Sequence, residues 1–133
     1  MPDFKKARVI KHEIPASSYH DIVIETNEEV VFEPGQFISI KVGETRINSY
    51  SIAGKVNVRQ LGLIVDIKPG GEGSQFFANL KVGDEILFLG PLGKFVLRPD
   101  DGSEHLIFLG TGSGIAPLKA MIEKALRDLQ MKA

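Results

Sequence analysis

Three polar side chains of different chemistry alternate in the segment 46–53, RINSYSIA. If this segment is a β-strand, its period of two places Arg46, Asn48 and Tyr50 on one face and Ser51 on the other. A guanidinium can hold a phosphate with two hydrogen bonds, and a tyrosine ring can stack on a planar ring system. The spacing predicts a site for a flat, polar, anionic ligand, although a strand with a surface arginine and no ligand has the same pattern.

A glycine-rich turn, 69–74, comes before Phe76, Phe77 and Leu80, which share one helical face. The pattern predicts a short helix that starts near Ser74. Its free backbone N–H groups and dipole would favour an anion. The alternative is a serine that caps the helix after a hairpin turn and binds nothing.

A second glycine-rich turn, 110–114, follows the apolar run 106–109. Apolar residues then recur at helical spacing: Ile115, Leu118, Met121, Ile122, Ala125, Leu126 and Leu129. This order predicts a buried strand, a turn and a helix, which is how a parallel α/β unit begins. Three glycines in five residues weaken a purely structural turn through chain entropy, so we favour a turn that a ligand approaches.

The elements that position these residues are mostly strands. Alternation and Gly/Pro turns indicate strands near 7–12, 21–25, 36–42, 46–53, 61–68, 85–89 and 94–98. Many short strands with frequent turns favour an antiparallel barrel or sandwich. Helices are predicted only near 74–80 and 115–131, where the period changes to 3.6.

The composition excludes several classes of function. The chain has 133 residues, 43% hydrophobic and 25% charged, as in an ordinary globular domain, and its formal net charge is -1. No large basic cluster is present, so we expect no nucleic-acid partner. The absence of cysteine excludes a thiol nucleophile and a cysteine-ligated iron–sulfur cluster within this sequence. No apolar run has signal-peptide or membrane-spanning length, so the default expectation is a cytoplasmic protein without membrane insertion.

The sequence contains no motif for metal binding or for hydrolysis. His12, His20 and His105 lack metal-ligand spacing and are expected at surface or strand-end positions. The aspartates form no convincing acid/base pair, and no Ser/His/Asp triad can be proposed.

Taken in chain order, these motifs resemble the ferredoxin–NADP reductase family, whose flavin-binding strand reads Arg-x-Tyr-Ser. There the tyrosine packs on the isoalloxazine ring, the serine approaches flavin N5, and the arginine binds a flavin phosphate. The resemblance implies that Tyr50 and Ser51 act at the flavin and that Ile52 adjoins it. The sequence departs from the pattern because Asn48 stands at the arginine position and Arg46 lies two residues earlier, about 7 Å along a strand. Arg46 is therefore expected to contact the phosphate only weakly, with Asn48 supplying a neutral hydrogen bond.

The two glycine-rich turns also match the family in kind and order. The resemblance implies flavin phosphate contacts at Gly71, Gly73 and Ser74. It implies nicotinamide dinucleotide contacts at Gly110, Thr111, Gly112 and Gly114.

The resulting prediction is a mainly β protein with two parts. Residues 1–102 are expected to form a six-stranded antiparallel Greek-key barrel that binds flavin, and residues 103–133 the first β-α unit of an incomplete α/β nucleotide-binding domain. The resemblance implies FAD, with FMN as second choice, and an enzyme passing electrons from NADH or NADPH to a redox protein such as a ferredoxin. A non-catalytic flavin-binding module and a barrel without ligand are the alternatives.

The second part is expected to be half built. The strand 106–109 lacks an obvious parallel neighbour, and the helix after it needs a surface to pack on. This segment is expected to pack on the barrel or on a second copy, or to belong to a fragment. We therefore expect flavin binding, poor NAD(P)H binding, slow turnover, and self-association through residues 105–131.

Overall fold

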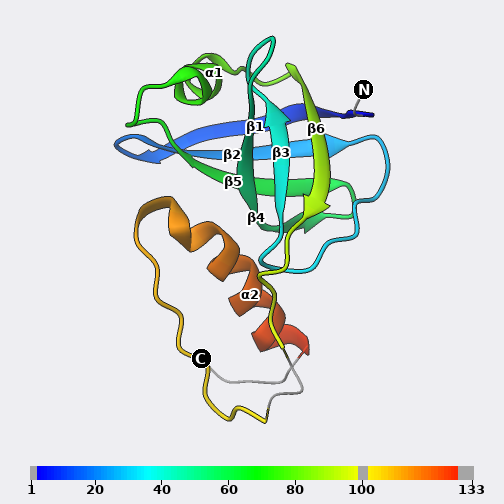
Figure 1. Ribbon diagram of the computed structural model, residues 1–133, viewed down its shortest axis with the longest axis vertical. Coiled ribbons are helices and arrows are strands. Elements are labelled where there is room, and N and C mark those ends of the chain that lie inside the picture. Colours follow the sequence, from blue (N-terminus) through cyan, green and yellow to red (C-terminus); the bar gives the residue numbers. More distant parts are fainter. Residues whose placement is uncertain (1–2, 99–101, 129–133) are drawn as a thin grey trace.

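The computed structural model describes residues 3–98 and 102–128 and contains a closed β-barrel (Figure 1). Its strands are β1 (Lys5–Ala16), β2 (Tyr19–Thr26), β3 (Phe37–Lys41), β4 (Ile47–Asn57), β5 (Gln60–Asp66) and β6 (Glu85–Leu92). Their order around the barrel is β1-β2-β5-β4-β3-β6, and every pairing is antiparallel. The predicted six-stranded Greek-key barrel is confirmed.

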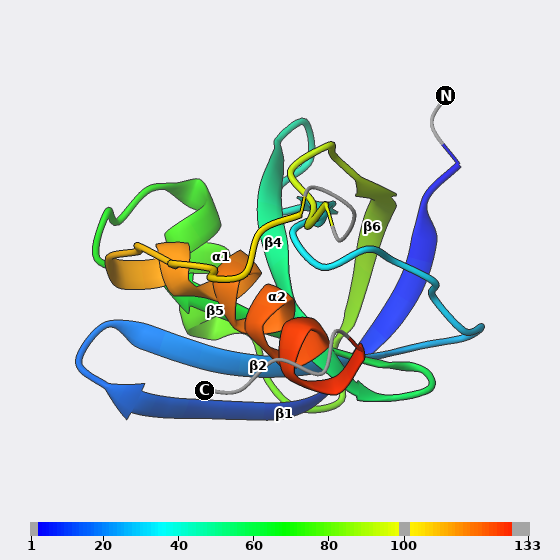
Figure 2. The same cartoon turned by 90° about the horizontal axis from the view of Figure 1, so that it is seen from below.

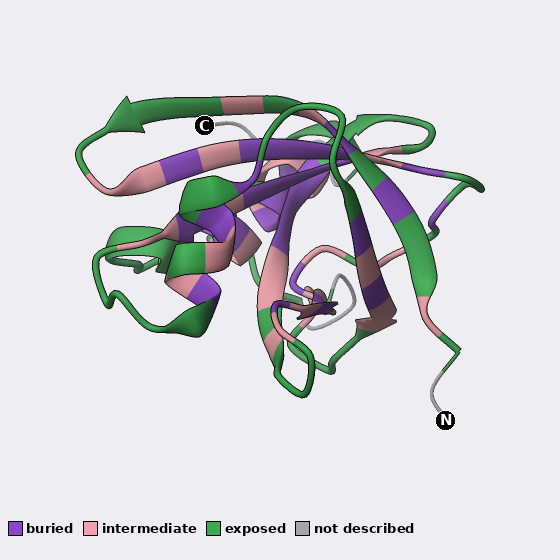
Figure 3. Cartoon of the chain, turned by 90° about the horizontal axis from the view of Figure 1, so that it is seen from above, coloured by how far each residue is buried: buried purple, intermediate pink, exposed green. Residues whose placement is uncertain are grey.

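Buried and exposed residues alternate along the strands of the barrel. Inward-facing residues recur every second position along the strands, so each strand presents an apolar face to the same interior (Figure 3). The most deeply buried of these are Val9, Ile22, Ile24, Ile38, Ile40, Ile52, Leu61, Leu63, Ile86 and Phe88. Burying one such side chain stabilises the fold by about 1.5–3 kcal/mol.

Helix α1 (Glu72–Asn79) covers one end of the barrel, where its fully buried Phe77 joins the core (Figure 1). The helix starts two residues before the predicted start at Ser74, because Gly71 rather than Ser74 occupies the N-cap position. The hydroxyl of Ser74 instead accepts a hydrogen bond from the backbone N–H of Gly70, at 3.2 Å.

Helix α2 (Ile115–Asp128) lies on the other side of the barrel and packs against β4 (Figure 2). Its apolar face is buried through Ala116, Leu118, Ala120, Met121 and Ala125. An ion pair between Lys124 and Glu33, 2.8 Å long, adds a polar contact with the loop that precedes β3. Of the arrangements considered for this segment, the helix packs back on the barrel.

Two predicted strands are absent. Residues 94–98 are not a strand, because β6 runs on to Leu92 and already pairs with both β1 and β3. Residues 106–109 are not a strand either. They have no partner for their backbone groups within the described ranges 3–98 and 102–128, and Ile107 and Leu109 are 84% and 87% exposed. The predicted domain boundary adjoins 99–101, and the predicted end of the long helix falls at 129–131. Both segments lie outside the described residues.

Candidate functional site

Strand β4 and helix α1 meet at Gly73. A Cβ atom on this buried glycine would lie 2.4 Å from Nδ2 of Asn48 and 2.6 Å from the hydroxyl oxygen of Tyr50. Real side chains essentially never approach that closely. Only a residue without a side chain lets the first turn of α1 rest on the polar face of β4, so two predicted site segments are brought into contact.

Tyr50 is held against the same helix. Its ring and that of Phe77 form a T-shaped pair with centroids 4.7 Å apart and an interplanar angle of 71°. Burial raises the pKa of Tyr50, and the hydrogen bond from Asn48 and the charge of Arg46 only partly oppose this shift. Its hydroxyl is therefore protonated at neutral pH and serves as a neutral hydrogen-bonding group beside the start of α1.

Arg46 stands at the rim of this group. It precedes β4, and its backbone carbonyl accepts a hydrogen bond from the N–H of Val42 at 3.0 Å. Its side chain is exposed, and Nε donates to Oδ1 of Asn48 at 3.3 Å. Asn48 Nδ2 in turn donates to the Tyr50 hydroxyl at 3.4 Å. The three side chains that alternate in the sequence thus form one hydrogen-bonded row.

The other predicted residues of β4 differ in orientation. Ile52 is fully buried in the barrel core, so any contact that it makes with a cofactor is through its main chain. Ser51 is half-buried and pairs with Phe37 across the β3–β4 ladder. Because successive strand residues alternate, its side chain lies on the face opposite Tyr50.

The first turn of α1 carries one acidic residue. The carboxylate of Glu72 lies over Gly43 in the β3–β4 loop, where a Cβ atom on Gly43 would overlap it. The first N–H groups of a helix lack intrahelical partners, and together with the helix dipole they favour an anion. Gly71, Gly73 and Ser74 therefore surround a backbone that can take a phosphate, with Glu72 turned toward the neighbouring loop.

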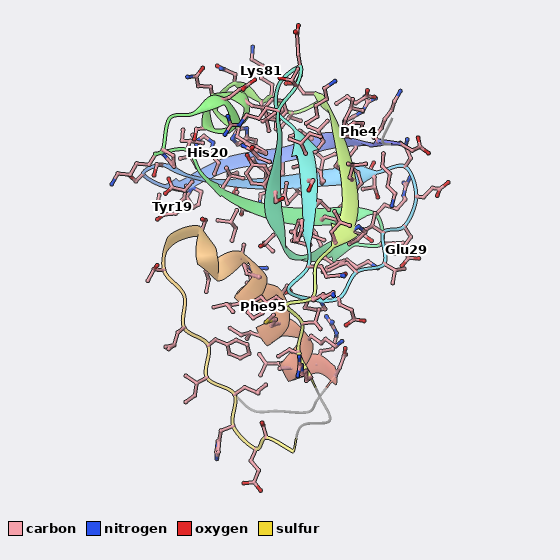
Figure 4. All side chains as sticks on the ribbon, in the orientation of Figure 1. Phe4, Tyr19, His20, Glu29, Lys81 and Phe95 are labelled. Atoms are coloured by element: carbon pink, nitrogen blue, oxygen red, sulfur yellow. The ribbon has the colours of Figure 1, made fainter. Side chains whose placement is uncertain are left out.

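The second glycine-rich turn forms a separate group on the side of α2. Gly112–Gly114 make a short 3-10 turn that leads directly into Ile115. Gly112 has φ +57°, and a Cβ atom on it would lie 3.1 Å from the hydroxyl of Tyr19. Tyr19 stands at the beginning of β2, beside this turn (Figure 4). Gly110, Thr111, Gly112 and Gly114 are exposed, as a ligand-facing turn requires.

Strand β4 connects the two groups. Three residues after Tyr50, the carbonyl of Ala53 accepts a hydrogen bond from Nζ of Lys119 on α2, at 3.1 Å. Lys119 also pairs with Glu123, which lies against Gly54. Neither Tyr19 nor Lys119 was predicted as part of a site, since the only local signal was the i, i+4 spacing of Lys119 and Glu123.

Other classes of site find no support within residues 3–98 and 102–128. No group of three or more His, Asp or Glu side chains there could hold a metal ion. Among the helices of these segments, none has the length and apolar character needed to cross a membrane.

The residues at the β4–α1 junction fit a flavin nucleotide. A half-buried aromatic ring, a row of neutral and cationic donors, and an approachable helix start together match its ring system and phosphate. The chemistry of the donor set and the close approach at Gly73 support this match independently of the sequence pattern.

Comparison with known proteins agrees with this geometry. Residues 7–97 match the family model of the oxidoreductase FAD-binding domain. The chain is 36% identical over 98 residues to the electron transfer component of toluate 1,2-dioxygenase from Pseudomonas putida, covering 72% of this chain and 29% of that protein. It is 33% identical over 138 residues to chloroplastic ferredoxin–NADP reductase, leaf isozyme 1, from Arabidopsis thaliana, covering 88% and 38%. The chain thus spans about a third of the length of these relatives.

Solved structures share the fold. An Amycolatopsis cytochrome P450 reductase superimposes with a TM-score of 0.84 at 30% identity, over 93% of this chain and 39% of that chain. Ferredoxin–NADP+ reductase from Plasmodium falciparum gives a TM-score of 0.79 at 26% identity, over 98% and 54%. The similarity therefore extends beyond the barrel to include α2.

Proposed function

The chain belongs to the oxidoreductase FAD-binding domain family, and on that premise we propose that it binds FAD where β4 meets α1 and serves electron transfer between NAD(P)H and a redox partner. FMN is the second choice of cofactor. The observation that carries the proposal is the contact of Asn48 and Tyr50 with Gly73 at the start of α1. A cytoplasmic location remains part of the proposal.

Each residue at the junction has a distinct role in the proposal. Tyr50 supplies a ring surface and a protonated hydroxyl, and its contact with Phe77 limits its motion. Gly71, Gly73 and Ser74 present the start of α1 to the phosphate, and Arg46 adds a weak, exposed charge. Ser51, whose side chain lies on the face of β4 opposite Tyr50, would act at the reactive edge of the ring system, as the resemblance implies. When bound, the flavin supplies the hydride-accepting and electron-transferring chemistry.

The nicotinamide site is a further part of the proposal. Gly110, Thr111, Gly112 and Gly114 would face the dinucleotide at the N-terminus of α2. The two relatives named above are described as an electron transfer component and a ferredoxin–NADP reductase, which supports this electron donor and a ferredoxin-type partner. In the proposal, residues 1–102 are the flavin-binding unit and residues 103–133 the first part of the nucleotide-binding unit.

Turnover by this chain alone is proposed to be slow. Residues 106–109 pair with no strand among the described residues, and Ile107 and Leu109 are exposed. No sheet is therefore formed beside the glycine-rich turn within the described part of the chain. This observation favours a second candidate function, a flavin-binding module that does not itself react with NAD(P)H.

Flavin titration with visible spectroscopy tests the proposal. Residues 1–133 should bind FAD or FMN with a changed flavin spectrum, and Tyr50→Ala should weaken binding by about tenfold or more, or about 1.4 kcal/mol. Tyr19→Ala is the matched control, because it removes the other tyrosine from the turn side of the barrel. No spectral change at saturating FAD and FMN would refute the flavin site.

Anaerobic addition of NADH or NADPH then separates the two candidates. Bleaching of the bound flavin at an enzymatic rate supports the reductase, whereas an unbleached flavin supports the non-catalytic module.

A further inference from the structure

The amide of Asn48 has a defined orientation because of its neighbour Arg46. A guanidinium carries five N–H donors and no acceptor, so the Asn48 atom that faces it must be the carbonyl oxygen. The structure agrees, with Arg46 Nε donating to Oδ1 at 3.3 Å. The NH₂ group of Asn48 must then point the other way along the row, toward Tyr50.

That orientation determines which hydrogen bonds Tyr50 can make. A tyrosine hydroxyl has one proton to donate and also accepts. Nδ2 of Asn48 donates to it at 3.4 Å, so on the protein side the hydroxyl is an acceptor. Within residues 3–98 and 102–128, Asn48 is the one hydrogen-bonding partner of this hydroxyl. Its proton is left for a group outside the chain.

The place to which this proton is presented is the junction with α1. The Tyr50 hydroxyl and the Asn48 amide both lie against Gly73, where no side chain intervenes. Any acceptor on a ligand bound at the start of the helix therefore meets a hydroxyl whose direction is already set.

We propose that Asn48 is a positioning residue, an inference that rests on the proposed flavin site. Held by Arg46 with its NH₂ group toward Tyr50, it makes the Tyr50 hydroxyl a donor to the flavin. Asn48 thus acts through Tyr50 and does not itself bind the phosphate. Arg46 stands two residues before the position where the Arg-x-Tyr-Ser pattern has its arginine. In this chain its guanidinium would orient two neutral groups in series, the Asn48 amide and the Tyr50 hydroxyl, which together are called the relay below.

The exchange Asn48→Asp reverses the relay without changing its shape. A carboxylate has no proton to donate, so the Tyr50 hydroxyl would donate to it and could no longer donate to a ligand. The new negative charge also disfavours tyrosinate, so the pKa of Tyr50 should rise by about one unit or more. Asn57→Asp is the matched control, since Oδ1 of Asn57 accepts from the N–H of Val58 and a carboxylate preserves that bond.

The experiment has two readouts. The first is ultraviolet titration of tyrosinate in the flavin-free protein, which is selective because the chain has two tyrosines and no tryptophan. A Tyr19→Phe background isolates Tyr50. The second is the affinity for FMN and for riboflavin, which lacks the phosphate. Riboflavin separates loss of the hydroxyl from simple repulsion between a carboxylate and a phosphate.

We expect Asn48→Asp to raise the pKa of Tyr50 and to weaken FMN and riboflavin alike by about tenfold, while Asn57→Asp changes neither. Arg46→Met is the second variant, chosen because the Arg46 side chain is exposed and the exchange leaves the barrel core unchanged. By freeing the amide to rotate, it should shift both readouts in the same direction but less.

Three results would overturn the positioning role. Loss of FMN affinity with unchanged riboflavin affinity and Tyr50 titration would make Asn48 a direct phosphate ligand. A shifted titration with unchanged affinity for both flavins would show that the hydroxyl serves no ligand. Binding of FMN without measurable binding of riboflavin by the unmodified chain would also count against it. If the unmodified chain binds neither flavin, the flavin site itself is wrong, which is a different failure.

Discussion

Gly73 and Tyr50 are 23 positions apart in the chain, yet a Cβ atom on Gly73 would lie 2.6 Å from the tyrosine hydroxyl oxygen. The contact makes the start of α1 and the polar face of β4 one structural unit. Gly73 is therefore required by the protein's own packing, before any ligand is considered.

Gly73→Ala tests this contact. In an unobstructed helix, alanine is more favourable than glycine by about 1 kcal/mol. Here the clash with Asn48 and Tyr50 should outweigh that gain, and we expect a net loss of about 1–3 kcal/mol of unfolding free energy in urea denaturation. Flavin affinity should fall as well. Gly71→Ala is the control, because nothing lies within 4 Å of its Cβ position, and its effect should be on the order of 0.5 kcal/mol. A stabilised Gly73→Ala variant would contradict the packing argument.

Arg46→Ala should weaken flavin binding by less than about a hundredfold, or about 2.7 kcal/mol. The reason is that the Arg46 side chain is exposed and donates to Asn48. A direct charge-assisted bond to the phosphate would contribute about 1.5–3 kcal/mol and would be evident in fluorescence titration. Arg8→Ala is the control for the loss of one positive charge, because Arg8 is an exposed residue of β1. A larger loss at Arg46 alone would make it a true phosphate clamp.

The stability of the protein should fall on acidification because of a histidine pair that the sequence pattern did not indicate. Of the expected surface or strand-end positions, His20 has the second: it lies near the start of β2 and is only 4% exposed, and its Nδ1 lies 2.5 Å from Nε2 of His12. Nδ1 of His12 bonds the carbonyl of Leu80, next to the end of α1, at 2.7 Å. Burial, and then the proximity of His12, lowers the pKa of His20.

The unfolded chain therefore binds a proton more readily than the folded chain. The contribution of His20 is complete above its unfolded pKa of about 6.5 and declines as the pH falls toward its lowered folded pKa. Denaturation midpoints measured from about pH 8 to about pH 5 should show this decline. His20→Gln should flatten it, and His105→Gln, at an exposed site, should not. A decline of equal size in both variants would assign the effect elsewhere.

Self-association through residues 105–131 is expected to depend on the residues that remain exposed. Much of the apolar face of α2 is already buried on the barrel, and Ile107 and Leu109, 84% and 87% exposed, are the most exposed apolar side chains described in this segment, ahead of Ile115 and Leu126 at 43% each. Sedimentation velocity of the unmodified chain should show concentration-dependent association, and the double change Ile107→Ser, Leu109→Ser should abolish it. Val31→Ser is the control, since Val31 is 81% exposed in another loop. A monomer at all concentrations would refute this prediction.

The sequence by itself determined the class of fold and the candidate segments. Alternation such as that of Leu61, Leu63 and Val65 records which side of a strand is buried, and all three are core residues in the barrel. The change to helical spacing after Gly114 located α2, whose first residue is Ile115. Such periodicities are local, so they can be recognised without knowing what the segment packs against.

Only the tertiary structure decided which segments meet. The apolar run 106–109 has the composition of a buried strand, but strand formation also requires a partner for its backbone groups, and a single-segment pattern does not contain that information. The contacts of Gly73 with Tyr50 and of His12 with His20 depend in the same way on how strands and helices come together. A periodic pattern specifies which face of an element is buried, whereas the partner of that face is set by the closure of the whole barrel.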